Sequence, residues 1–294
     1  MEILKDNPLD NQNNVILLKQ NSFDNIDWEG TPWRERVFSH PERTITIGTS
    51  CSGIGAPEQA LRQLGLKHEI LFAGDIDKNV KKSYFANYDI KEGQWHTDMF
   101  KFDATPYKGK LTLFIAGICC QTFSRAGKLK GIEDEKRGGL FKAFCRIVRE
   151  CEPKVWIIEN VGNMLTSNKG KDWSKIKSEL DRLGYDIHYQ VLNAKNYGVP
   201  QDRERLFVVG FKEATEFLFP CPLKSDTCFY DILEDTTPCQ RKITPREALR
   251  LQGFSDDFKI AVNKTYVYKQ AGNSIPVPFL KALFQQMDIT EFGF

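Results

Sequence analysis

Two adjacent cysteines and one glutamate are the residues of this sequence best suited to covalent catalysis. Cys119 and Cys120 stand in a glycine-led polar stretch, residues 117–124, that follows a short apolar run, and Glu159 directly follows another such run. A thiolate can add to an electron-poor carbon, and a nearby carboxyl group can stabilise the activated substrate. The alternative is a pair of structural thiols, because free cysteine is among the most buried residue types.

A glycine-rich turn and two aspartates indicate a site for a nucleotide-like cofactor. Residues 51–55 read Cys-Ser-Gly-Ile-Gly and stand between a predicted strand and a predicted helix, where backbone N–H groups can approach a ligand. Asp75 ends the next predicted strand, a position from which an acid can bind ribose hydroxyls. Asp98 follows a later strand in the same way and could reach a base edge. Without a ligand, the turn would be a tight connection only.

Two polar stretches nearer the C-terminus are further candidates. Gln201, Arg203 and Arg205 alternate at the entrance of a predicted strand, which points their side chains to one side. Asn273 and Ser274 belong to residues 269–274, which we expect to open the last helix and to provide a cap or a ligand for a polar cofactor group. The structural alternatives are a salt-bridged strand entrance and a simple helix cap.

Short apolar strands that alternate with amphipathic helices must position these residues. Strands are predicted at 44–47, 70–73, 111–116, 155–158, 187–192 and 206–210, and helices at 57–64, 80–88, 140–151, 173–183 and 277–287. Another helix begins at Thr244, where Thr-Pro-Arg-Glu supplies an N-cap, a proline in the first turn and a glutamate three residues after the cap. The alternation predicts an α/β fold with a doubly wound, mostly parallel sheet.

Composition excludes several classes of protein. With 294 residues, 41% hydrophobic and 27% charged, the chain has the composition of a globular protein, and no apolar run approaches the roughly 20 residues that cross a bilayer. Eight irregularly spaced cysteines indicate reduced thiols in the cytoplasm, and no spacing indicates a metal site. The net charge of +2 neither requires nor excludes a polyanionic partner. Residues 125–149, however, hold eight basic and three acidic side chains. This segment could contact phosphates or be a solvated face.

In their order along the chain, the motifs resemble those of the cytosine-5 DNA methyltransferases, from about residue 44 to residue 287. The resemblance implies a Rossmann-like fold that binds S-adenosylmethionine. The residues that match the cofactor pocket are Ser52, Gly53, Ile54, Gly55, Asp75, Ile76, Asp98, Met99, Leu140, Asn273 and Ser274.

The resemblance also implies methyl transfer to carbon 5 of a cytosine that is flipped out of DNA. Cys120 matches the nucleophile that attacks carbon 6, and Glu159 matches the residue that contacts the base at N3. Arg203 matches a residue that holds the base, and Arg205 a neighbouring support. The further positions expected to contact substrate are Gln121, Ser124, Arg125, Asn160 and Gln201.

Two departures from the family pattern bear on activity and on target choice. Cys119 stands where the family usually has proline, which leaves two adjacent thiols. Residues 213–241 are much shorter than the usual target-recognition domain. We therefore expect an N-terminal extension at 1–42, a catalytic and cofactor-binding domain at 43–212, a shortened recognition segment at 213–241, and C-terminal helices at 242–294 that complete the catalytic domain.

Three other functions remain open from the sequence. An RNA (tRNA) cytosine-5 methyltransferase would share the motifs, and a non-catalytic cofactor-binding regulatory subunit would share the fold. A dinucleotide dehydrogenase would explain the glycine turn but not Cys120 and Glu159. We expect DNA as the partner, RNA as the alternative, no membrane, and a protein partner as one way to supply target recognition. The expected location is the cytoplasm, at a bacterial nucleoid or in a phage-infected cell.

Overall fold

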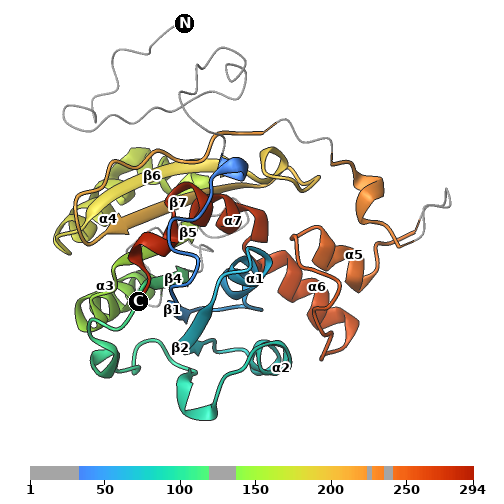
Figure 1. The fold of residues 1–294 in the computed structure, drawn as a ribbon, viewed down its shortest axis with the longest axis horizontal. Coiled ribbons are helices and arrows are strands. Elements are labelled where there is room, and N and C mark those ends of the chain that lie inside the picture. The colour runs from blue at the N-terminus through green and yellow to red at the C-terminus, as the bar shows by residue number, and fades with distance from the viewer. Residues whose placement is uncertain (1–32, 119–136, 224–226, 235–240) are drawn as a thin grey trace, which may run out of the picture. The chain divides into compact units, whose positions relative to one another are not determined.

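A seven-stranded sheet with the strand order β3-β2-β1-β4-β5-β7-β6 is the centre of the fold (Figure 1). The computed structural model describes residues 33–118, 137–223, 227–234 and 241–294. β7 is antiparallel to both of its neighbours and the other pairs of adjacent strands are parallel. This confirms the expected mostly parallel sheet. The strands are β1 Ile45–Ser50, β2 His68–Gly74, β3 Trp95–His96, β4 Leu113–Gly117, β5 Val155–Asn160, β6 Asp186–Asn193 and β7 Glu204–Phe211.

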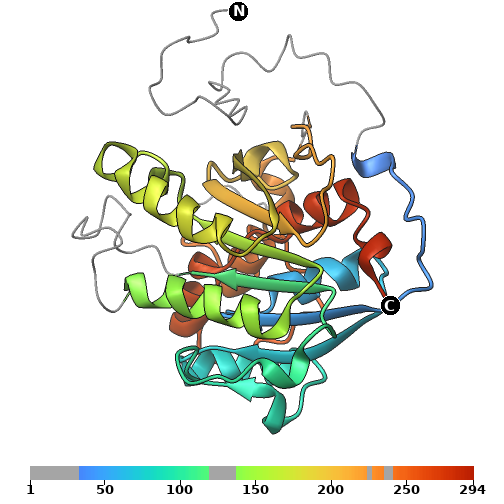
Figure 2. The same ribbon diagram turned by 90° about the vertical axis from the view of Figure 1, so that its left-hand side faces the viewer.

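Helices cover both faces of the sheet, as Figure 2 shows. They are α1 Ala56–Gln63, α2 Lys78–Asn87, α3 Arg137–Cys151, α4 Lys171–Asp181, α5 Pro245–Arg250, α6 Lys264–Asn273 and α7 Val277–Gln286. Side chains of α1 and α7 join one hydrophobic core, and those of α3 and α4 join the other. Alternate residues of each central strand serve the two cores: Leu113 and Ile115 of β4 belong to the first, and Phe114 and Ala116 to the second. The fold is therefore doubly wound, as predicted.

The strands that carry candidate residues extend further at their carboxyl ends than the sequence predicts. β1 continues to Ser50, and β5 continues to Asn160. Glu159 is thus the penultimate residue of a strand and is held by the sheet. Pairing with a neighbour makes this extension favourable, because a polar residue at the end of a strand still completes the backbone ladder.

The prediction that residues 269–274 open the last helix is wrong. Asn273 is the last residue of α6 and Ser274 is its C-cap, while α7 begins after Pro276. Proline disfavours helical backbone in the residue before it, here Ile275, so the chain must leave one helix before it starts the next. α6 itself was not predicted from the sequence. The strand expected before Asp98, whose bounds were not predicted, is the two-residue β3.

The segment between β7 and α5 is held to α5 by a buried carboxylate. The predicted N-cap of α5 is confirmed, since the Thr244 side chain accepts a hydrogen bond from Glu247 N. The fully buried Glu247 side chain accepts hydrogen bonds from Thr244 N and Glu234 N, both at 2.7 Å, and from Arg241 at 2.7 and 2.8 Å. The hydrogen bonds from Arg241 are the main cause that lowers the pKa of Glu247 from 4.5 to about 2.

Replacing Arg241 with methionine should lower the free energy of unfolding by about 2–3 kcal/mol at pH 7, because a buried carboxylate would lose its guanidinium partner but keep two backbone donors. Because the folded-state pKa of Glu247 is depressed, its contribution is complete above pH 4.5 and declines as the pH falls toward 2. Urea unfolding of both proteins at several pH values between 7 and 3.5 would measure this. A stability difference that is constant over that range would contradict the assignment to Glu247.

None of the helices that the structure describes is long and apolar enough to cross a membrane. The described part of the chain also contains no group of three or more His, Cys, Asp and Glu side chains that could hold a metal ion.

Candidate active site

The turn after β1 lies at the carboxyl edge of the sheet and has the backbone of a ligand-binding loop. Cys51, Gly53 and Gly55 have positive φ angles of 51°, 54° and 80°. A Cβ atom on Gly55 would lie 2.3 Å from the ring of Tyr88, so both the backbone angle and this contact require glycine. A Cβ atom on Gly53 would meet no other atom within 4 Å. The turn is therefore packed on its inner side and open at Gly53.

Hydrogen bonds tie this turn to the end of β2. Ser52 N donates to Gly74 O at 2.9 Å, and the Ser52 hydroxyl donates to the same oxygen at 3.0 Å and accepts from Gly74 N at 2.8 Å. Asp75 accepts from Gly53 N at 3.2 Å and from Asp77 N at 2.9 Å. Burial raises the pKa of Asp75, while these backbone donors act in the opposite direction. Three of the predicted cofactor residues are thus joined in one arrangement.

The next two predicted positions, Ile76 and Asp98, come shortly after β2 and β3. Ile76 follows Asp75 and is 88% exposed, which is unusual for a large apolar side chain. β3 pairs with β2 so that His96 lies beside Gly74. Ile76 and Asp98 therefore each come two residues after a paired strand end. An open glycine, an acid and an exposed apolar side chain fit a nucleoside, whose ribose has hydroxyl groups and whose base has a flat face.

Met99 and Leu140 contribute to this region by packing. Met99 is 5% exposed and belongs to the core beneath α3, and Leu140 packs against the same core. Arg146 of α3 donates to Met99 O at 2.9 Å and forms an ion pair with Glu150. Arg146 therefore holds the loop after β3. Of the basic residues in 125–149, it is one whose guanidinium group already has partners within the protein.

The described residues expected to contact substrate, here called the substrate side, lie at or next to the ends of β5 and β7, beside the end of β4. Glu159 pairs in register with Gly117, the last residue of β4. Asn160 bridges the two strands, because its side-chain amide lies 3.5 Å from Ile118 O. The predicted Cys120, Gln121, Ser124 and Arg125, together with Cys119, lie outside the described residues, which stop at Ile118 and resume at Arg137. Glu159 thus stands beside the point where the chain enters the cysteine motif.

Glu159 forms an ion pair with Arg205 across the sheet. Arg205 Nε lies 2.9 Å from Glu159 Oε1, and their side chains are 19% and 13% exposed. The pair forms because β7 lies between β5 and β6, with Phe207 opposite Glu159. Burial raises the pKa of Glu159, and the positive charges of Arg205 and Arg203 limit this rise. Such a carboxyl group is suited to donating or sharing a proton.

Arg203 and Gln201 connect the substrate side to the C-terminal helices. Arg203 donates to Ser274 O at 2.9 Å, and Gln252 donates to Gln201 at 3.3 Å through its side chain. Ser274 is buried, whereas Asn273 is exposed. Ser274 therefore enters the site through its backbone carbonyl, at the junction of α6 and α7.

Glu58, a buried carboxyl group close to the cofactor turn, was not among the predicted site residues. It lies on α1 and is fully buried. Its only signal in the sequence is an acidic residue at position 58, next to the small and apolar residues that make the buried side of a predicted helix.

The strand order, the glycine turn after β1 and the acids after β2 and β3 define a Rossmann-like, S-adenosylmethionine-dependent methyltransferase domain. The family model for C-5 cytosine-specific DNA methylases matches residues 46–237 and 229–288. The chain belongs to this family.

Known proteins of similar sequence and structure agree with this assignment. The Type II methyltransferase M.SsoII of Shigella sonnei is 32% identical over 89% of this chain and 84% of its own length. M.HpaII of Haemophilus parainfluenzae is 31% identical over 79% of this chain and 86% of its own length. The crystal structure of S. pombe Dnmt2 methyltransferase superposes with a TM-score of 0.65 at 17% identity, covering 83% of this chain and 98% of that one, and shows the same fold.

Proposed function

We propose that this enzyme methylates carbon 5 of a flipped-out cytosine in DNA through a covalent adduct with Cys120. The observation that carries the proposal is the position of Glu159, which is buried, paired with Arg205, and in register with the strand end that leads into the cysteine motif. Sequence similarity to Type II DNA methyltransferases supports DNA as the substrate.

The cysteine makes carbon 5 reactive. The Cys120 thiolate forms a bond to carbon 6, and the electrons of the 5,6 double bond move into the ring toward N3. Carbon 5 of this enamine-like ring would then form the new bond to the methyl group as the bond between that methyl group and the sulfonium sulfur breaks, which would leave S-adenosylhomocysteine. Removal of the carbon-5 proton by a base reforms the double bond and expels the thiolate. S-adenosylmethionine supplies the electrophilic methyl group, and the turn at 51–55, Asp75, Ile76 and Asp98 would hold it.

Glu159 would stabilise the activated ring at N3. Its raised pKa allows the carboxyl group to present a proton to N3 as negative charge develops there. Arg205 fixes the orientation of the carboxyl group by its contact with Oε1. Arg203 is anchored on Ser274 O, and would hold the base while linking it to the helices that close the cofactor side.

Target recognition would rest on a short segment. The described parts of 213–241 contain one 3-10 helix, Phe229–Ile232, between β7 and α5. Flipping a base costs a few kcal/mol of stacking and pairing, and contacts to the DNA must offset this cost. We extend the proposal to a cytoplasmic enzyme at the bacterial nucleoid or in a phage-infected cell, with a protein partner as the source of further DNA contacts.

The proposal is tested by methyl transfer from labelled S-adenosylmethionine to duplex DNA and to RNA, with the product nucleoside identified by mass spectrometry. We expect 5-methylcytosine in DNA. Label in RNA alone would replace DNA by RNA as the substrate, and label in neither polymer would contradict the proposed activity. A DNA duplex that contains 5-fluorocytosine should form a covalent complex, because fluorine cannot be removed as the proton is.

A further inference from the structure

A chain of buried and half-buried hydrogen bonds leads from Glu58 to the glycine turn at residues 51–55, here called the cofactor turn. The Tyr84 hydroxyl of α2 donates to Glu58 Oε1 at 2.5 Å, and the Thr49 hydroxyl of β1 lies 3.4 Å from the same oxygen. The Thr49 and Ser52 hydroxyls are 2.7 Å apart, and Ser52 clamps Gly74 through both its N–H and its hydroxyl. Glu58 is therefore connected through Thr49 and Ser52 to Gly74, the residue before Asp75.

The hydrogen bonds of Glu58 are one-sided. Both of its side-chain partners reach Oε1, while Oε2 is buried and has no hydrogen-bond partner among the described residues. A carboxylate shares its charge between both oxygens, so an ionised Glu58 would place negative charge on a buried atom without a donor. The arrangement around Glu58 suits its neutral form better than its ionised form.

The protonation state of Glu58 also sets the direction of the chain, because each hydroxyl has one hydrogen to donate. The Thr49 hydroxyl lies within reach of both Glu58 Oε1 and the Ser52 hydroxyl. With a neutral Glu58, Thr49 would donate to Ser52, and Ser52 would donate to Gly74 O. With an ionised Glu58, the carboxylate would attract the hydrogen of Thr49, Ser52 would donate to Thr49, and Gly74 O would keep only the bond from Ser52 N.

We propose that Glu58 is a positioning residue for the cofactor turn and that its neutral form favours cofactor binding. The inference rests on the proposed function only in taking S-adenosylmethionine as the cofactor. In the neutral state the clamp between Ser52 and Gly74 is complete. It holds Asp75 where its carboxylate accepts the hydrogen bond from Gly53 N.

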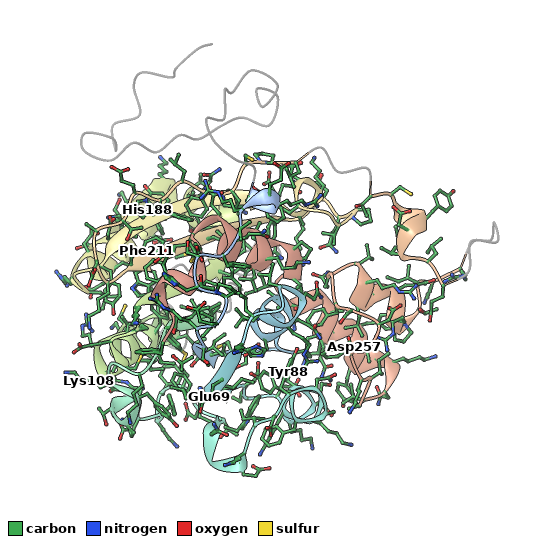
Figure 3. All side chains as sticks on the ribbon, in the orientation of Figure 1. Glu69, Tyr88, Lys108, His188, Phe211 and Asp257 are labelled. Carbon is green, nitrogen blue, oxygen red and sulfur yellow. The ribbon has the colours of Figure 1, made fainter. Side chains whose placement is uncertain are left out.

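Among Glu58 and the two tyrosines packed near it, Glu58 is the group that changes charge near neutral pH. Burial raises the pKa of Glu58 from 4.5 to about 7. Burial also raises the pKa of Tyr84 and of Tyr88 well above the usual value, so both tyrosines of α2 stay neutral. The negative charges of Glu58 and of Asp257, which follows α5, raise the pKa of Tyr88, and the positive charge of Arg62 on α1 lowers it. Tyr88 and Asp257 are labelled in Figure 3.

The test is calorimetric binding of S-adenosylhomocysteine to the full chain without DNA, from pH 6 to pH 8.5. Wild-type affinity should weaken about tenfold over this range, since a group with a pKa near 7 can change binding by at most tenfold per pH unit above it. The isosteric, neutral Glu58→Gln variant should lack this loss of affinity. The ligand is the same in both titrations, so the difference between the two pH profiles isolates Glu58.

Two tyrosine variants complete the test. Tyr84→Phe removes the donor that lowers the pKa of Glu58, and should shift the loss of affinity to higher pH. Tyr197→Phe is the matched control, because Tyr197 is also buried and its hydroxyl donates one hydrogen bond, to Pro220 O at 2.7 Å. It should bind like the wild type. The same pH dependence in wild type and Glu58→Gln would overturn the inference, whereas failure of the wild type to bind at any pH would contradict the proposed function.

Discussion

Replacing Cys120 with serine should reduce methyl transfer to DNA by on the order of 10³-fold or more, while leaving the affinity for S-adenosylhomocysteine unchanged. A serine hydroxyl stays protonated near neutral pH and adds poorly to carbon 6 of cytosine, so carbon 5 is never activated. Single-turnover methylation of duplex DNA measures the loss. Calorimetry with S-adenosylhomocysteine shows whether the cofactor site is intact.

Cys119→Ser provides the matched control for Cys120→Ser, because it removes the neighbouring thiol from the same motif. This variant should retain methyl transfer within about tenfold, and it should still form a covalent complex with DNA that contains 5-fluorocytosine. Cys120→Ser should form none. The opposite pattern, with activity kept in Cys120→Ser and lost in Cys119→Ser, would show that the other thiol is the nucleophile.

Local sequence signals predicted most of the elements that carry the site. The strand before the glycine turn, the amphipathic helix at 140–151 and the cap at Thr244 all depend on residues close in the chain, and the structure contains all three. α6 is different, because some of its hydrogen bonds are to a helix distant in the chain. Gln270 bonds Ser83 and Asn79 of α2, and these contacts cannot be seen in its own stretch of sequence.

The pairing of Glu159 with Arg205 was also beyond the sequence. Each residue was a candidate, but their contact depends on β7 lying between β5 and β6, although β6 comes first in the chain. The environment of Glu58 depends in the same way on how α2 packs against α1, since α2 provides Tyr84. The motifs thus predicted which residues belong to the candidate site, whereas the pKa of each carboxyl group depends on its tertiary contacts.

Replacing Glu159 with glutamine should lower kcat for DNA methylation by about 10²- to 10⁴-fold, the usual contribution of a positioned acid or base. Glutamine has nearly the same shape and can donate a hydrogen bond to N3, but it cannot share a proton with the ring. In the wild type, the raised pKa of Glu159 means that the carboxyl group keeps its proton to higher pH than usual and loses it as the pH rises further. In the wild type, kcat should fall as the pH rises and Glu159 loses its proton. This fall should be absent in Glu159→Gln.

The partner of Glu159 allows the catalytic loss to be separated from structural damage. Glu159→Gln leaves the mostly buried Arg205 without its carboxylate, so some stability should be lost as well. Adding Arg205→Met removes the unpaired charge, and thermal unfolding of this double variant should move back toward that of the wild type. Methyl transfer should stay low in the double variant, because no carboxyl group faces the base. Recovery of activity together with stability would show that Glu159 serves only to neutralise Arg205.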